Sequence, residues 1–570
     1  MSKRFWSWTL ITLLVASSLI VLVSSRDVVA EDGASSPLLT GLVFDQQDQP
    51  VEGVQVTVVA PDQGDQLGSV VTQADGRYAL AIPGSVPDRL IVQLERAHFE
   101  NKQIELSAAS IQSLKGGQTV VMPDTSLSRS IGAAFWLAAA VFVGVLVTVA
   151  LGRLHNALAA LAGATVVLGA SYLSHIGFEG LYVFDFHGAL GYVDWNVIFL
   201  IMGMMIVIAV IERTGIFQWL AFMAYRISRG RIWLLVPILM IVTGVGSAFL
   251  DNVTTMLLMT PITIQIAMAM GLNPLALLMP EVMASNVAGV STLVGTPTNI
   301  LIGSYAGITF NDFLKNLTPG VLLALVGLVI YSELAYRRQL RQANATSPML
   351  LEKLAERARI TQPNHLKKAG LVGAGMLILF VFGERIHLLP AVTALIGATA
   401  LLLWIRPDIE EMIEAVDWTT LVFFIALFIV VGAIQEVGLI SMIADLIGRL
   451  VGDSLILAML AIVWLGALLS TVVANIPFTA AMLPVVGYLT AIVPGAQNKA
   501  LYYSLSVGSG MGGNGSLIGA SANMVTAGIT ERAGYPISYL YFLKKGLPAL
   551  LITVGLASGW LLVRFLLLGG

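Results

Sequence analysis

Four stretches of polar and small residues interrupt the apolar segments of this chain, and they are its strongest candidates for chemistry. Two lie in the first half, at residues 247–255 and 291–299, and two in the second half, at 470–479 and 512–523. Non-helical backbone within a membrane is tolerated only where it is buried in protein or lines a wet cavity. A broken helix offers amide groups that attract anions, and free carbonyl groups that coordinate sodium together with Asn, Thr or Ser oxygens. The four breaks therefore predict one shared site for an ion or an ionic substrate.

Asp251 is the ionisable residue that stands out in these breaks. A carboxylate inside a membrane is costly and marks ion or proton pathways, so we predict that Asp251 binds a coupling ion, either a proton or sodium. A sodium ion would be held at Asp251, Asn252 and Asn475. The alternative is that Asp251 only caps the half-helix that follows it, or lies near the outer interface. The full set of predicted substrate- and ion-binding residues is Asp251, Asn252, Thr254, Thr255, Asn286, Gly295, Thr296, Thr298, Asn299, Asn475, Thr479, Asn514, Ser516, Ser521 and Asn523.

Other ionisable residues have simpler interpretations. Asp194 and Asp417 each precede a predicted helix, so we expect helix N-caps rather than ligands. Glu281 follows Pro280 within an apolar helix; it either faces the cavity or caps a helix start. The six histidines show no metal-ligand spacing, and the chain has no cysteine, which excludes disulfides and thiolate metal sites. No catalytic motif is present, so we predict no enzyme, no catalytic residue and no cofactor beyond the coupling ion.

The composition requires a lipid environment around most of the chain. Of the 570 residues, 57% are hydrophobic and 11% are charged, whereas roughly a quarter of the residues of a soluble protein are charged. Uncharged apolar stretches recur along the sequence, which predicts an all-α polytopic membrane protein with about 10 to 12 membrane segments. The net charge of -3 indicates no acidic or basic macromolecular partner. The predicted partners are a small ionic substrate and membrane lipid, and no nucleic acid.

An internal repeat joins the two halves of the membrane region. Asn252 and Asn475 are 223 positions apart, and the same offset relates several other identical pairs. A one-residue insertion then brings Asn299 onto Asn523, so the halves are duplicates. In this register Asp251 falls on Ala474, and the two halves therefore differ in charge at the candidate site. The remaining pairs include residues 193–195 with 416–418, Gly215 with Gly438, Pro261 with Pro484 and residues 293–295 with 517–519.

Basic residues predict the orientation of the chain. The segment 337–368 holds eight lysines and arginines against two glutamates, so it should be a cytoplasmic linker between the membrane regions 131–336 and 369–570. The loop around Asp194 has no basic residue and should face outward, whereas Asp417 should face inward. The repeats are therefore predicted to have opposite orientations, which suits a secondary transporter with broken helices, since two such halves can alternate around one central site.

The N-terminal region is predicted to be exported. Lys3 and Arg4 precede an apolar run, and compact residues at 28–30 suit a signal peptidase. Residues 1–30 therefore predict a signal peptide, with an uncleaved anchor helix as the alternative. Residues 39–122 are polar, with apolar residues alternating around Val54, Val56 and Val58, and predict a small β-sandwich. The protein should thus be a multi-pass plasma (inner) membrane protein with an extracytoplasmic β-domain.

The β-domain resembles a known family. Residues 50–54 and 75–78, within 42–80, are similar to the carboxypeptidase regulatory-like domain, a transthyretin-like sandwich common as an extracytoplasmic appendage. The resemblance implies a fold and no catalysis. A passive spacer or a docking module is the role we expect.

The membrane region resembles the ion transporter superfamily. The run from Asp251 to Pro261, residues 281–286 and residues 295–299 are similar to citrate transporters, arsenite permeases, D-type sodium/proton antiporters, the melanosomal P protein and the divalent anion/sodium symporters. The likeness is greatest to the P-protein and arsenite-permease branch. In the anion symporters, Ser-Asn-Thr motifs bind sodium and the substrate carboxylate, and this chain has no such tripeptide at those positions. The resemblance implies a transporter, and relatives form homodimers, although no residue of this chain specifies one.

Three hypotheses follow for the function. The first is a secondary active transporter that moves an anion, oxyanion or cation, as a symporter or an antiporter, with sodium or protons. The second is an ion channel or an uncoupled permease. The third is a sensor in which the β-sandwich reads an external ligand.

Overall fold

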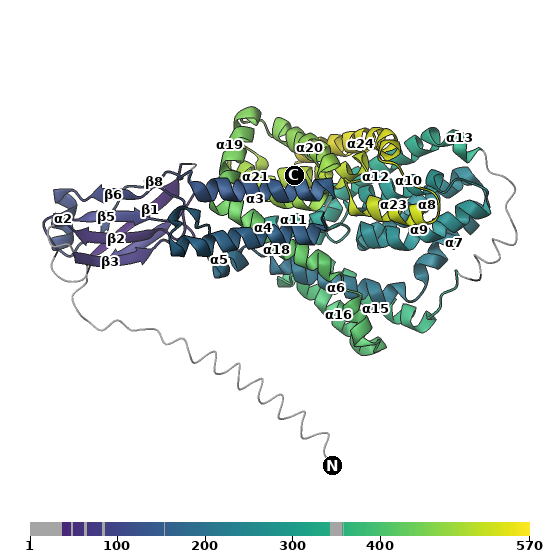
Figure 1. The fold of residues 1–570 in the computed structure, drawn as a ribbon, viewed down its shortest axis with the longest axis horizontal. Helices are drawn as coiled ribbons and strands as arrows, with labels where there is room; N and C mark the ends of the chain where they lie inside the picture. The colour runs from purple at the N-terminus through teal and green to yellow at the C-terminus, as the bar shows by residue number, and fades with distance from the viewer. Residues whose placement is uncertain are drawn as a thin grey trace, which may run out of the picture. The chain divides into compact units, whose positions relative to one another are not determined.

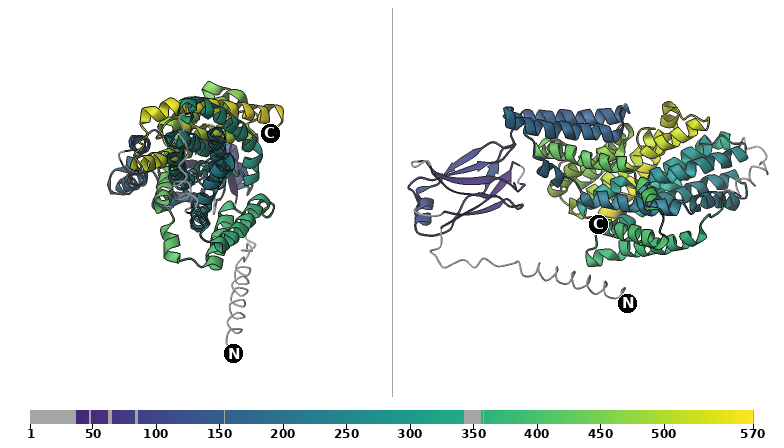
Figure 2. Two further views of the ribbon diagram at one scale, coloured as in Figure 1. Left: turned by 90° about the vertical axis from the view of Figure 1, so that its right-hand side faces the viewer. Right: turned by 60° about the horizontal axis from the view of Figure 1, so that its bottom comes forward.

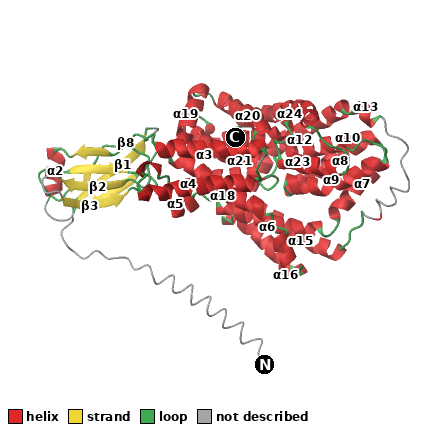
Figure 3. Ribbon diagram, in the orientation of Figure 1, coloured by secondary structure: helices red, strands yellow, loops and turns green. Residues whose placement is uncertain are grey.

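The computed structural model describes residues 37–46, 49–61, 65–82, 86–152, 154–341, 356 and 358–569. It divides into two compact units, Met1–Arg129 and Ser130–Gly570. The predicted signal peptide, residues 1–30, lies outside the described residues. Figure 3 distinguishes the two units by their secondary structure, with strands in the first and helices in the second.

The first unit contains the predicted β-sandwich. Its two four-stranded sheets have the orders β4-β1-β7, with β8 also paired to β1, and β3-β2-β5-β6. Buried and exposed residues alternate along β1 and β2, and the inward side chains form one apolar core. The elements are β1 (Leu38–Asp45), β2 (Gln55–Ala60), β3 (Asp65–Val71), β4 (Arg77–Ala81), β5 (Ile91–Glu95), β6 (Lys102–Glu105), α2 (Ala108–Lys115), β7 (Val120–Val121) and β8 (Thr125–Leu127).

The turn predicted before β4 depends on Gly76. Its φ is +74°, and a Cβ atom there would lie 2.5 Å from the carbonyl oxygen of Val43. Asp75 supports the turn because its carboxylate accepts a hydrogen bond of 3.1 Å from the amide of Arg77. Only glycine combines this backbone conformation with so close a neighbour.

The second unit is helical, and eleven of its described helices are long and apolar enough to span a membrane. This agrees with the predicted number of segments. The long helices are α3 (Ala133–Leu151), α4 (Asn156–Leu173), α6 (Trp195–Glu212), α8 (Ile232–Phe249), α9 (Asn252–Ala269), α12 (Phe310–Ala335), α15 (Pro363–Phe382), α18 (Trp418–Glu436), α20 (Leu455–Val472), α21 (Asn475–Ile492) and α24 (Tyr539–Leu562).

Shorter helices connect and complete these spans. The segments that approach the breaks are α10 (Leu275–Gly289), α11 (Pro297–Ala306), α22 (Ala500–Gly512), the short helix η5 (Gly513–Gly515) and α23 (Ser521–Arg532). The predicted linker region contains α13 (Arg337–Leu340) and the first residues of α15. The others are α5 (Phe186–Gly191), α7 (Ile216–Ser228), α16 (Pro390–Ile405), α17 (Ile409–Glu414) and α19 (Leu439–Val451), together with η1 (Ser174–Ile176), η2 (Glu179–Leu181), η3 (Gly383–Ile386), η4 (Ala496–Asn498) and η6 (Val563–Leu567).

The internal duplication extends to whole helices. Helix α6 begins at Trp195 and α18 at Trp418, 223 positions later, and α5, α7, α8 and α9 match α17, α19, α20 and α21 at the same offset. The halves also exchange contacts reciprocally, because α6 packs against α16 and α18 packs against α4 (Figure 1, Figure 2). Each half therefore completes its packing with a helix from the other half.

The backbone is broken where the sequence predicts it. Helix α8 ends at Phe249 and α9 begins at Asn252, and α20 and α21 are separated in the same way at residues 473–474. Non-helical residues 290–296 separate α10 from α11, and residues 513–520 separate α22 from α23 through η5. The four breaks thus occur as two matched pairs.

Candidate functional site

A cavity of about 490 Å³ lies where the four breaks meet. The first break contributes Asp251 and Thr254, the second Pro297, the third Ile476 and the fourth Ser521. Both halves of the repeat therefore border one space, as the sequence predicts. This cavity is the candidate functional site.

Several helices begin at the cavity wall, three of them in the second, third and fourth breaks. Helix α11 starts at Pro297, α21 at Asn475 and α23 at Ser521. Thr296 caps α11, whereas α21 and α23 have no side-chain cap. Because the amide groups of a first helical turn carry partial positive charge, these starts favour an anionic group in the cavity.

Asp251 is the helix cap that the sequence offered as an alternative, and it also lines the cavity. It is the N-cap of α9, and its Oδ1 accepts a hydrogen bond of 2.9 Å from the amide of Thr254. The Thr254 hydroxyl donates to Oδ2 over 2.6 Å. The side chain is half-buried and lines the cavity. The carboxylate is therefore held in a fixed orientation at the cavity wall, with lone pairs left for a further cation.

Asp417 also lines the cavity, which the sequence did not predict. It is the expected N-cap of α18, and Asp194 is likewise the N-cap of α6. Burial disfavours the ionised form of Asp417, but hydrogen bonds from Thr419 and Thr420 outweigh this effect and lower the pKa of its carboxyl group. Asp417 is therefore a second carboxylate at the cavity wall.

An asparagine cluster behind the cavity joins the two halves. Asn286 on α10 accepts a hydrogen bond of 3.0 Å from Asn252. Its own amide nitrogen donates to Asn514 and to Asn523, over 3.0 Å in each case. All four side chains are at most 6% exposed. The predicted residues Asn252, Asn286, Asn514 and Asn523 thus form one buried network in which one residue contacts both halves.

Matched hydrogen bonds hold the breaks in the two halves. Ser247 donates to the carbonyl of Ser285 over 2.9 Å, and Ser470 donates to that of Ser509 over 2.9 Å. The side-chain amide of Asn299 donates to the backbone carbonyl of Thr292 over 2.8 Å, and the side-chain amide of Asn523 donates to that of Ser516 over 2.9 Å. The hydroxyls of Thr292 and Ser516 in turn donate to the backbone of α8 and α20. Asn299 and Ser516 therefore brace the site rather than line it.

Gly295 allows the second break to approach its neighbours. A Cβ atom there would lie 2.5 Å from the carbonyl oxygen of Gly289 and 2.9 Å from that of Ser247. A Cβ atom at its counterpart Gly519 would lie 2.9 Å from the carbonyl oxygen of Ser470. Gly295 is thus structural, and its neighbours Val294 and Pro297 line the cavity.

Gly295→Ala should destabilise the protein by about 1–3 kcal/mol, because the added methyl group must displace backbone. The melting temperature of the purified protein in detergent measures this effect. Gly144→Ala is the control, because nothing lies within 4 Å of a Cβ atom at Gly144. An unchanged melting temperature for Gly295→Ala would contradict the close approach.

The remaining predicted residues are buried and have local roles or no described role. Thr298 and Thr296 share a hydrogen bond of 2.7 Å between their hydroxyls. Thr255 and Thr479 each donate to a carbonyl group one turn back in their helix. Asn475 is 5% exposed at the start of α21. Of the predicted set, Asp251, Thr254 and Ser521 line the cavity itself.

Other cavity residues carried no clear signal in the sequence. His155, Glu212, Thr419 and Thr420 line the same space from α4, α6 and α18. They lie far from the four breaks along the chain, so only the folded structure brings them to the site.

Glu281 does not line this cavity, and it lies inside α10 rather than at a helix start. Both interpretations offered for Glu281 from the sequence are therefore wrong.

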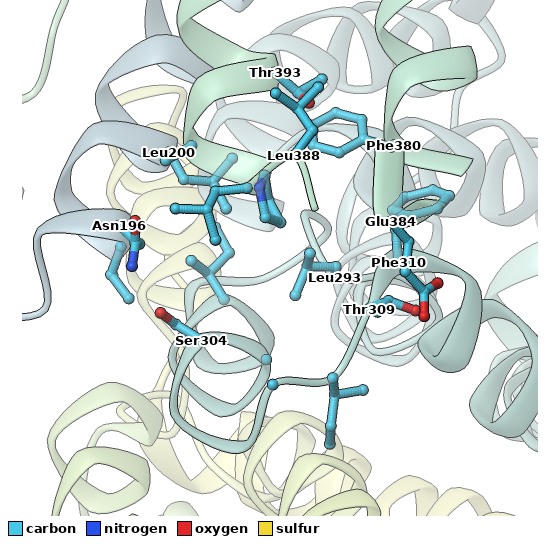
Figure 4. Close-up of a pocket in the computed structure, with 18 of the residues that line it drawn as sticks. Asn196, Leu200, Leu293, Ser304, Thr309, Phe310, Phe380, Glu384, Leu388 and Thr393 are labelled. Carbon is cyan, nitrogen blue, oxygen red and sulfur yellow. The ribbon is translucent and has the colours of Figure 1, made fainter. Parts of the chain in front are cut away.

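A second, more apolar cavity of about 280 Å³ adjoins the first. Leu200, Leu293 and Phe380 contribute apolar surface, and Asn196 and Glu384 contribute polar groups (Figure 4). Ile300 of α11 lines both cavities. The α11 segment thus lies between two spaces that reach different parts of α6: the smaller cavity its beginning, and the larger cavity its middle and end.

The described residues contain no group of three or more histidine or acidic side chains that could hold a metal ion.

The citrate transporter family matches residues 142–508 of the chain. This chain belongs to the citrate transporter family. It is 35% identical to an uncharacterized transporter of Mycobacterium bovis over 433 residues, which cover 76% of this chain and 99% of that protein. The family and these relatives are transporters, not enzymes.

Other relatives of this citrate transporter family member agree with the predicted superfamily. The human P protein is 31% identical over 551 residues, covering 83% of this chain and 65% of the P protein. The YdaH transporter of Alcanivorax borkumensis has a TM-score of 0.51 at 16% identity and covers 72% of this chain and 99% of that one. MtrF of Neisseria gonorrhoeae has a TM-score of 0.51 at 12% identity, covering 76% and 96%. These two structures share the fold of this chain. The family and the eleven apolar helices described above make the chain a multi-pass membrane transporter.

Proposed function

We propose that this transporter is a secondary active one, which moves a small ion by alternating access and couples it to a sodium or proton gradient. The observation that carries the proposal is the single cavity bordered by all four breaks. A site built from two related halves can be exposed to either side of the membrane when one half moves against the other. A channel would need a continuous path rather than a site enclosed between breaks.

The charges at the cavity favour an anionic or oxyanionic substrate bound together with a cation. The uncapped starts of α21 and α23 supply partial positive charge. Asp251 and Asp417 supply carboxylates on the same cavity wall. No lysine or arginine lines this cavity in the described part of the chain. An anion would therefore bind best after a sodium ion or proton has neutralised Asp251, which couples the two ions.

The adjoining cavities support alternating access. Ile300 separates the polar cavity from the apolar one, and both reach the same helix α6. A small movement of α11 would therefore change which of the two cavities the substrate can reach. Because α11 begins at one of the four breaks, it is not anchored by a continuous helix on that side.

Reconstitution in vesicles tests this proposal. Purified protein is screened for uptake of labelled oxyanions and carboxylates under imposed sodium or proton gradients. Saturable uptake that follows one gradient, with counterflow when both sides contain substrate, supports a coupled transporter. Currents without saturation or counterflow would instead establish the channel alternative.

Deletion of residues 39–122 should leave transport intact. The β-sandwich has its own apolar core, and the four breaks and both cavities lie entirely in the second unit. The deleted protein keeps the N-terminal residues that direct export and is compared with the full chain in the same vesicles. Loss of transport, with normal insertion and melting temperature, would favour the sensor hypothesis instead.

A further inference from the structure

A buried polar pocket lies among α8, α9 and α10, apart from both cavities. Glu281 on α10 is 0% exposed, and so are Thr243 on α8 and Thr260 and Thr263 on α9. None of these four residues lines either cavity. A carboxyl group at such a site needs a partner, because an ionised and unpaired carboxylate is very costly away from water.

The hydrogen bonds in this pocket are incomplete. Thr243 donates to Oε1 of Glu281 over 2.9 Å. Oε2 of Glu281 is buried without a hydrogen bond, as are the hydroxyl oxygens of Thr260 and Thr263. Thr263 nevertheless lies close enough to interact with the carboxyl group. A proton on Oε2 would turn an unpaired acceptor into a donor that can bond to the unpaired hydroxyl oxygen of Thr263.

No charged side chain neutralises Glu281 in the described part of the chain. Helices α8 and α9 carry no charged or titratable residue, and Glu281 is the only one on α10. The other helices packed on α10 carry such groups, but none of them forms a described hydrogen bond or ion pair with Glu281. They are Asp312, Lys315, Tyr331 and Glu333 on α12, Tyr502 and Tyr503 on α22, Glu531 and Arg532 on α23, and Tyr539, Tyr541, Lys544 and Lys545 on α24.

The second half shows that the fold does not require this pocket. In the repeat register that matches Pro261 with Pro484, the positions of Thr243, Thr260 and Thr263 are taken by Gly466, Leu483 and Val486. The matched bonds of Ser285 and Ser509 to α8 and α20 set the register of α10, which places Leu505 at the position of Glu281. The same packing is therefore achieved with four apolar residues. The polar residues of the first half are therefore not needed for the packing. Because burying them costs stability, their presence indicates a function.

We propose that Glu281 is a proton-binding site, with Thr243 and Thr263 as its hydrogen-bonding partners, and that it supplies the proton coupling of the transporter. The proton taken up from water on one side bonds to Oε2, and the same bond breaks when the proton leaves to the other side. The coupling part of this inference rests on the proposed transport function. The protonation part does not.

The position of Glu281 on α10 offers a route to the central site. Asn286 lies five residues further along the same helix, roughly 7.5 Å along its axis. It is the residue that joins Asn252 to Asn514 and Asn523. A change in the bond between Glu281 and Thr243 alters how α10 packs on α8, and α10 carries Asn286 with it. Protonation is thereby connected to the asparagine network that bridges the two halves.

Infrared difference spectroscopy of the purified full-length protein tests the protonation directly. We expect a protonated-carboxyl band that titrates with pH in the wild type and is missing from Glu281→Gln. Glu410→Gln, which changes an exposed carboxylate on α17, should leave that band in place. A band that does not respond to pH, the absence of any difference band, or a carboxylate band that shifts with sodium at constant pH would each overturn the proton site.

Transport in vesicles tests the coupling separately. Glu281→Gln should lose uptake driven by a pH gradient while retaining counterflow at equal pH, because the amide can still accept from Thr243 but cannot release a proton. Unchanged pH-driven uptake would overturn the coupling role. If no substrate is transported by the wild type, the proposed function fails while the infrared titration still decides the site.

Two further variants guard against misfolding of Glu281→Gln. Glu281→Leu introduces the residue found at the matched position of the second half. Thr243→Val removes only the hydrogen bond to Oε1, and it should change the pH at which the carboxyl band titrates. If that pH is unchanged in a folded Thr243→Val protein, the band does not come from this pocket and the proposal is wrong.

Discussion

Asp251→Asn should lower coupled transport by at least about 30-fold, which corresponds to about 2 kcal/mol of lost ion binding. Asparagine is as good an N-cap as aspartate, so α9 should keep its start and the protein should keep its fold. What disappears is the negative charge at the cavity wall. The variant therefore separates the helix cap, which asparagine keeps, from the cation-binding role that we propose for Asp251.

Asp194→Asn provides the matched control for this prediction. Asp194 caps α6 through hydrogen bonds from the amides of Asn196 and Val197, at 3.0 and 3.3 Å, and it does not line the polar cavity. Its replacement should leave transport close to that of the wild type. Initial uptake rates in vesicles, with melting temperatures for both proteins, measure the difference. A fully active Asp251→Asn protein without pH or sodium dependence would remove the role proposed for this carboxylate.

Asn286→Ala should cost about 3 kcal/mol or more in stability and abolish transport, because three buried amide groups each lose the hydrogen bond that they make with Asn286. The groups belong to Asn252, Asn514 and Asn523, which come from both halves of the repeat. A lower melting temperature and lost uptake are the expected results. Asn286→Asp should keep the bond from Asn252 but set a carboxylate oxygen against the acceptor oxygens of Asn514 and Asn523, so it should be at least as damaging as alanine.

Asn498→Ala is the control for the asparagine prediction. Its side chain accepts a single local hydrogen bond of 3.0 Å from the amide of Ala500. Losing this bond should lower the melting temperature much less than Asn286→Ala does. Similar losses in the two variants would indicate that the network behind the cavity has no special importance.

Much of the architecture follows from local patterns in the sequence. The length and polarity of the apolar runs predict the membrane segments, and alternation around Val56 predicts the β-sandwich, because both depend on neighbours within a few residues. The offset between Asn252 and Asn475 predicts the duplication, and the helix boundaries confirm it. The family resemblance carried by residues 251–261 is also confirmed.

The sequence predicted where the candidate site lies, but not which residues line the cavity and which residues support the breaks. Polar residues in broken helices indicate where a site lies, because unpaired backbone is costly in a membrane. They do not indicate which side chains face the cavity. Asn299 and Ser516 brace the breaks, Gly295 permits a close approach, and Asp417 joins the cavity wall from a different helix.

The sequence alone determined that this is a duplicated membrane protein with four broken segments and one carboxylate, Asp251, that has no counterpart in the second half. The tertiary structure alone decided that Asn286 joins the halves and that Glu281 lies in a closed pocket away from the cavity. The physical reason is distance along the chain. Local periodicity determines helices and breaks, whereas two partners of Asn286, Asn514 and Asn523, lie more than 200 positions away, and only the packing of one half on the other brings them together.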